Sequence, residues 1–127
     1  YDAETWRPYC HVLDFARAIN KVFESKTEKV DKEVFNVGDN KNNFSKKKIV
    51  EQVSKYISSP KILFLKKGVD KRDYTVDFMK IKKRLTFKTK YSVNFGIKEI
   101  LNYVEKNKKN KKSLKKLGNF NISVAKL

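Results

Sequence analysis

Residues 13–24 read LDFARAINKVFE, and this stretch decides how the chain folds. Its apolar side chains recur three and four positions apart, which is the spacing of one face of an α-helix. They are Phe15, Ala18, Ile19, Val22 and Phe23. Asp14 precedes them, and an Asp in that position is a good helix cap. We therefore expect a helix over residues 13–24 that buries this stripe in the core.

Outward from this helix, short strands and further helices alternate. The sequence predicts an extended stretch at 6–12, a strand at 33–38, a loop at 39–43, a helix at 46–58, a strand at 61–66, a short helix that begins at 77 and a last helix that opens at 91–92. The fold class is α/β with two or three strands, which is few for a stable sheet. We expect its missing neighbours to come from residues upstream of Tyr1 or from a partner.

The length of 127 residues suits one domain or part of a larger one. Nine Phe and six Tyr supply enough aromatic bulk for a folded core. Residues 106–127 hold many Lys and no acid, so we divide the chain into a folded portion, 1–105, and a basic tail, 106–127. A single cysteine, Cys10, excludes a disulfide framework and a thiolate zinc site within the chain. No apolar run is long enough to cross a membrane, and we expect a cytoplasmic protein.

The charge is the strongest compositional signal, since 31 basic residues face 14 acidic ones and the formal net charge is +17. This balance raises an alternative function, a basic nucleic-acid-binding module without catalysis. Only four of the basic residues are Arg, whereas phosphate and base recognition favour the bidentate guanidinium. The Lys excess is therefore better explained by compositional drift, and we rank nucleic acid second.

Several catalytic classes lack their residues in this sequence. The four glycines stand alone at positions 38, 68, 96 and 118, so no glycine cluster can cradle a dinucleotide. A Tyr-x-x-x-Lys proton-transfer pair is also absent. His11 is the single histidine, and we interpret it as structural. We therefore assign no catalytic, cofactor-binding or metal-binding residue to this chain.

Three stretches together resemble one family. Residues 6–18 carry R-x-x-x-H-V-x-D-x-A-x-A, from Arg7 to Ala18. Residues 34–38, VFNVG, precede Asn43-Phe44-Ser45 and a helix. Residues 70–77, DKRDYTVD, precede a Lys-Ile pair, Leu85-Thr86-Phe87 and a Gly-Ile pair. In this order and at this spacing the three stretches resemble the C-terminal portion of NAD-dependent sugar-nucleotide epimerases and dehydratases, the extended short-chain dehydrogenases.

The resemblance implies a nucleotide-sugar-binding portion whose catalytic partner domain lies outside this chain. In the family an N-terminal domain holds NAD or NADP and the catalytic Tyr-x-x-x-Lys pair, and full-length enzymes pair as homodimers. The matching positions for substrate binding are Arg7, Asn43 and Arg72, with Asn42 adjacent to the second. Two Arg forks suit a diphosphate, because charge-assisted hydrogen bonds are strong and bidentate. A structural ion pair is the alternative role for either arginine.

Other motif residues are interpreted as structural. We expect Asp14 and Asp77 to cap helices, and Asn36 to bond the backbone of the loop that follows it. Thr86 replaces the Gly of the family's Leu-Gly-Phe, so a left-handed helix end must be made by Thr under strain. The expected core residues are Phe15, Ile19, Phe35, Val37, Ile49 and Val53.

Overall fold

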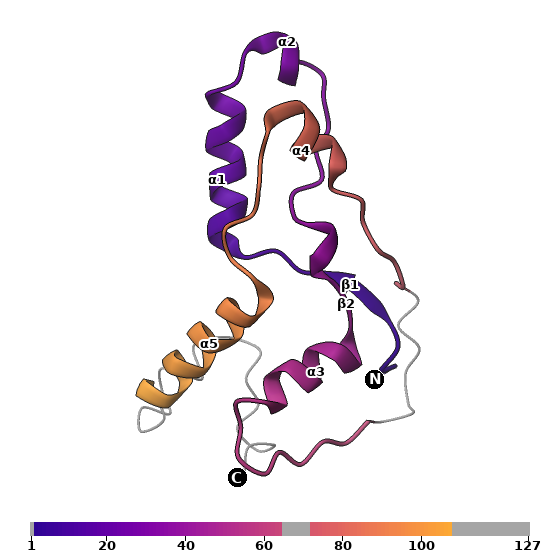
Figure 1. Ribbon diagram of the computed structural model, residues 1–127, viewed down its shortest axis with the longest axis vertical. Helices are drawn as coiled ribbons and strands as arrows, with labels where there is room; N and C mark the ends of the chain where they lie inside the picture. Colours follow the sequence, from indigo (N-terminus) through magenta and orange to yellow (C-terminus); the bar gives the residue numbers. More distant parts are fainter. Residues whose placement is uncertain (1, 65–71, 108–127) are drawn as a thin grey trace.

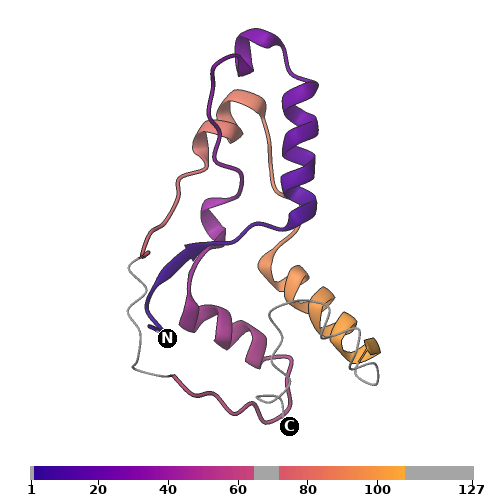
Figure 2. The ribbon, with the colours of Figure 1, turned by 180° about the vertical axis from the view of Figure 1, so that it is seen from behind.

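The computed structural model describes residues 2–64 and 72–107, which form a mixed α/β structure that is mostly helical. The elements are β1 (Trp6–Pro8), α1 (Val12–Phe23), α2 (Thr27–Val30), the 3-10 turn η1 (Asn40–Asn42), β2 (Asn43–Ser45), α3 (Lys46–Ser54), α4 (Met79–Leu85) and α5 (Val93–Asn107). Figures 1 and 2 show an elongated arrangement, with α1, α2 and α4 at one end, α3 and α5 at the other, and the β1–β2 ribbon between them. No helix among the described residues is long and apolar enough to span a membrane.

The sheet is an antiparallel ribbon of two three-residue strands. Its register pairs Trp6 with Ser45, Arg7 with Phe44 and Pro8 with Asn43. Two further backbone bonds extend the ladder, from the Tyr9 N–H to the Asn42 carbonyl at 2.9 Å and from the Lys46 N–H to the Thr5 carbonyl at 3.0 Å. The extended stretch predicted at 6–12 contains β1, as expected. Strand β2 was not predicted, since its first residue lies in the expected loop at 39–43. The next helix begins at residue 46, as predicted.

Helix α1 begins and ends within one residue of its prediction, but its cap differs. His11 is the N-cap, and its Nδ1 accepts the Leu13 N–H at 3.2 Å. Asp14 lies in the first turn with 0% of its surface exposed. Its carboxylate accepts the backbone N–H groups of Lys90 and Tyr91 at 2.9 Å each. The prediction that Asp14 caps α1 is therefore wrong; the side chain instead ties α1 to the segment that leads into α5.

The predicted burial of the α1 stripe is also wrong for most of its members. Ala18 is 2% exposed, but Phe15, Ile19 and Phe23 are 53%, 50% and 83% exposed. The main core lies between α1 and α4, and the described chain covers only the part of the stripe that faces α4. This core contains Ala18, Ile81, Leu85 and Phe87, with Val22, Val30, Phe35 and Val37 packed against it.

The two internal strands predicted from the sequence do not form in the residues that the structure describes. Residues 33–38 are irregular, as are 61–64, while the rest of the 61–66 prediction lies outside the described residues. Phe35 and Val37 still pack on the core as expected. The segment 33–38 runs beside residues 76–78: Asn36 donates to the Asp77 carbonyl at 3.4 Å, so it bonds a distant backbone rather than its own loop. A Cβ on Gly38 would lie 2.6 Å from the Phe78 ring, so only glycine permits this approach.

The helices near the ribbon follow the sequence more closely. Ser45 caps α3 as predicted, accepting the Lys48 N–H at 3.3 Å, but α3 ends at Ser54, four residues before the predicted end. Ser92 accepts the Phe95 N–H at 3.2 Å at the start of α5. Helix α5 continues to Asn107, two residues past the boundary expected for the basic tail, and residues 108–127 lie outside the description.

The ends of α4 test two predictions from the sequence. Phe78 is the N-cap residue of α4, and its side chain makes no capping hydrogen bond. The Asp77 carboxylate, which was expected to cap this helix, accepts the Met79 N–H at 3.1 Å from the position before the N-cap. At the other end Thr86 is the C-cap with φ 55° and ψ 26°. The prediction of a left-handed Thr at this helix end is confirmed.

Candidate functional site

Arg7 occupies the middle of β1, with its side chain half-buried. Its guanidinium carbon lies 5.2 Å from the centroid of the Tyr74 ring, and its Nη1 donates to the Trp6 carbonyl at 2.6 Å. A guanidinium over an aromatic ring is attracted to it, and this contact together with the hydrogen bond restricts the Arg7 side chain. Arg7 is therefore positioned before any ligand arrives.

The segment that carries Arg72 lies along the outer edge of β1. The Trp6 N–H donates to the Asp73 carboxylate at 2.8 Å, across 67 positions of sequence, and the Tyr74 N–H approaches the Trp6 carbonyl at 3.5 Å. Arg72 is exposed and directly precedes these contacts. The fold thus brings the segments of both predicted arginines to one strand. Lys48 lies 5.0 Å from the Trp6 ring, and the Trp6 side chain faces the side of the ribbon opposite to Arg7.

The Asn43 side chain points to the face of the ribbon opposite to Arg7. The register pairs it with Pro8, and alternate side chains on a strand face opposite sides, so Asn43 and Arg7 lie on opposite faces of the ribbon. Its amide donates to the Val76 carbonyl at 3.0 Å and accepts the Val76 N–H at 3.0 Å. In this arrangement Asn43 positions the segment that follows Arg72. Direct contact between Asn43 and a ligand remains a prediction from the resemblance.

The neighbouring Asn40 reinforces this connection. Its side chain donates to the Asp77 carboxylate at 2.9 Å and accepts the Phe78 N–H at 2.8 Å. The hydrogen bonds from Asn40 and the backbone N–H of Met79 hold the pKa of the Asp77 carboxyl below its ordinary value. The asparagines Asn36, Asn40 and Asn43 therefore fasten the 36–43 loop to residues 76–78.

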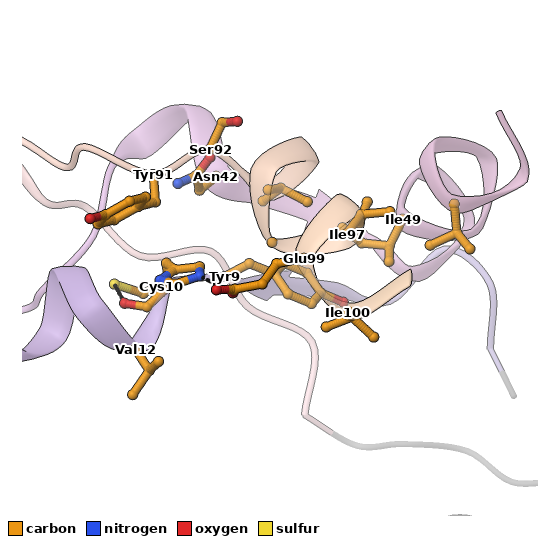
Figure 3. A pocket seen from close by; sticks show the side chains of 14 residues that line it. Tyr9, Cys10, Val12, Asn42, Ile49, Tyr91, Ser92, Ile97, Glu99 and Ile100 are labelled. Carbon is orange, nitrogen blue, oxygen red and sulfur yellow. Dashed lines mark hydrogen bonds and ion pairs between the residues drawn. The ribbon is translucent and has the colours of Figure 1, made fainter. Parts of the chain in front are cut away.

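A cavity of about 480 Å³ lies beside the ribbon, between α3, α5 and the segment that joins β1 to α1 (Figure 3). Its walls include Tyr9, Asn42, Ile49, Tyr91, Ile97 and Glu99. The three predicted ligand residues are not among its lining residues. Burial raises the pKa of the Tyr9 hydroxyl, while the positive charge of Arg7 opposes that change, which indicates that the charge of Arg7 reaches this end of the ribbon.

The cavity also contains the one histidine. His11 Nε2 lies 2.9 Å from Glu99 Oε2, and the imidazole packs against the Tyr91 ring with 4.8 Å between centroids. The cap to Leu13 and this ring contact are structural interactions of His11, as the sequence interpretation expects. Within residues 2–64 and 72–107 no three His, Cys, Asp or Glu side chains gather as metal ligands.

Scans of this chain against protein-family models, curated proteins and solved structures find no match. The functional argument therefore depends on the residues themselves. Sequence reasoning located the two arginines but missed Tyr74 as the ring beneath Arg7, and it missed the cavity. No local pattern signals either feature, because both are made by segments that lie far apart in the sequence.

Proposed function

We propose that this chain is the nucleotide-sugar-binding portion of an NAD(P)-dependent sugar-nucleotide epimerase or dehydratase, with the diphosphate held by Arg7 and Arg72. The observation that carries the proposal is the course of residues 72–74 along the edge of β1, which places both arginine-bearing segments at one strand. Asn43 supports the site by holding the backbone of Val76.

The chemistry required of this portion is binding and orientation. A diphosphate presents several anionic oxygens, which suit the paired N–H groups of a guanidinium. The stacking of Arg7 on Tyr74 supports a preorganised role, since less side-chain entropy is lost when the ligand binds. Hydride transfer would belong to NAD or NADP and to a tyrosine base, supplied by a cofactor-binding domain that this sequence does not include.

The test is a binding titration of the full chain with UDP and GDP, with uridine as the probe that lacks phosphate. We expect a diphosphate to bind more tightly than uridine. Arg7→Lys keeps the charge but removes the fork, so it should weaken diphosphate binding about tenfold to a hundredfold, the equivalent of one charge-assisted hydrogen bond. Arg84→Lys is the matched control, since Arg84 pairs with Glu33 far from β1. Equal binding of UDP and uridine, or no effect of Arg7→Lys, would overturn the proposal.

The net charge of +17 favours a second candidate, nucleic-acid binding without catalysis. Several aromatic rings that could stack on bases already carry a cation over one face, among them Trp6, Tyr56 and Tyr74. A salt titration separates the two candidates: binding of single-stranded DNA through many phosphates should fall steeply as salt rises, whereas diphosphate binding should fall much less.

A further inference from the structure

The cavity beside the ribbon has the size and composition of a small-molecule site. Ligand pockets are mostly apolar with a few polar groups, and range over about 300–1,000 Å³. This cavity measures about 480 Å³. Aliphatic side chains from two helices line it, Ile49 and Val53 from α3 and Ile97 and Ile100 from α5. A small apolar group would find contacts on two sides.

The charge of the lining is opposite to that of the chain. Although Lys and Arg make up 31 of the 127 residues, neither type is among the residues of 2–64 and 72–107 that line the cavity. The charged group that does line it is the carboxylate of Glu99, whose side chain is 56% exposed (Figure 3). The cavity therefore does not suit a phosphate, and it differs in character from the arginine-bearing edge of β1.

The contacts of His11 leave the charge of Glu99 uncancelled. Because Nδ1 accepts the Leu13 N–H, the ring proton belongs on Nε2, from which it is donated to Glu99 Oε2 at 2.9 Å. An imidazole that accepts at one nitrogen and donates at the other is neutral. A carboxylate accepts about four hydrogen bonds, so Glu99 can accept from a ligand as well.

Aromatic rings complete the polar end of the cavity. The His11, Tyr91 and Phe95 rings pack against one another, with centroid distances of 4.8 Å for His11–Tyr91, 4.9 Å for Tyr91–Phe95 and 5.6 Å for His11–Phe95. The Lys90 ammonium lies 5.8 Å from the Tyr91 centroid, a distance at which an aromatic ring attracts a cation. A carboxylate beside aromatic rings is an environment that favours an organic ammonium group.

We propose that this cavity binds an apolar molecule that carries an ammonium group. The ammonium donates to the Glu99 carboxylate near Tyr91, and the apolar body packs between α3 and α5. This site is separate from the proposed diphosphate site, since Arg7, Asn43 and Arg72 do not line it.

The test uses three probes of one shape on the ¹⁵N-labelled full chain: phenethylammonium, 2-phenylethanol and phenylacetate. Amide shifts should move at Tyr9, Ile49 and Ile97, and the ammonium probe should bind about two- to fivefold more tightly than the alcohol, as expected for a partly exposed ion pair. Phenylacetate should bind most weakly. Glu99→Gln should remove the preference for ammonium, while Glu51→Gln, an exposed carboxylate of α3, should leave it unchanged.

Three results would overturn the proposal: equal binding of the ammonium and the alcohol, the same loss of preference in Glu51→Gln as in Glu99→Gln, or shifts confined to residues outside the cavity. Glu99→Gln should fold, because its side chain is more than half exposed, and the dispersion of its amide spectrum checks this. Displacement of phenethylammonium by UDP at equal protein saturation would contradict the separation of the two sites.

Discussion

Asp14 is the position where a single atom change should cost most. Its carboxylate is fully buried and accepts the N–H groups of Lys90 and Tyr91, and it pairs with Arg17. Asp14→Asn keeps the shape but removes the charge and turns one acceptor into an NH₂ donor. An amide oxygen in the Oδ2 position still accepts from Tyr91 and Lys90, but the NH₂ group in the other position then faces the Lys90 N–H and the Arg17 guanidinium. A buried donor without an acceptor, or the loss of hydrogen bonds to a charged group, costs about 1–3 kcal/mol.

We therefore expect Asp14→Asn to lower the free energy of unfolding by about 1–3 kcal/mol, a substantial part of the 5–15 kcal/mol typical of a domain. The assay is urea unfolding followed by circular dichroism, with the slope against urea compared between variants. Arg17→Gln should cost about 1 kcal/mol or less, because Arg17 is 43% exposed and both backbone bonds remain. Asp31→Asn, at an exposed position, is the control. A loss below about 1 kcal/mol in Asp14→Asn would refute the reasoning.

Three further outcomes follow from single residues. Thr86→Gly should raise the free energy of unfolding by about 0.5–1 kcal/mol, since relief of the left-handed backbone exceeds the added entropy of glycine; a urea midpoint that falls would contradict this. The hydrogen bond from Lys80 holds the pKa of the Glu33 carboxyl below its ordinary value of 4.5. The stabilisation by this carboxylate is therefore present above pH 4.5 and is lost as the pH falls through the lowered pKa. Glu33→Gln should flatten the acid side of a curve of unfolding free energy against pH, and an unchanged acid side would argue against the bond. Burial, and then the charge of Asp14, raise the pKa of the Cys10 thiol, so iodoacetamide should react with it more slowly at pH 8 than with an unperturbed cysteine, which mass spectrometry can follow.

Local signals in the sequence predicted α1, α3, α4 and α5 but not the four-residue helix α2. The 3.6-residue period and the Ser45 hydroxyl fixed where α1 and α3 begin, because both depend on contacts a few residues apart. The left-handed Thr86 was predictable for the same reason. The cap of α1 was missed because the carboxylate of Asp14 is used by Lys90 and Tyr91, which no local pattern reveals.

The strands depended on distant partners and were predicted poorly. Residues 33–38 have a strand-like composition, yet no neighbouring strand among the described residues completes a ladder, and their polar contacts go to Asp77 instead. The pairing of residues 43–45 with β1 could not be seen in a three-residue stretch between a turn and a helix. The direction in which Asn43 points depends on that register, so the sequence could place this residue near the site but not orient it.

The exposed apolar side chains of α1 affect how the solubility of this chain depends on salt. Phe15, Ile19 and Phe23 stand in water at one end of a molecule whose net charge is +17, so electrostatic repulsion keeps copies apart while the apolar surface favours their contact. Salt shortens the range of repulsion from about 10 Å at 0.1 M to about 3 Å at 1 M and leaves apolar attraction intact. Colloidal stability should therefore be greatest in dilute buffer, and the high-salt washes that strip contaminants from basic proteins should here promote self-association.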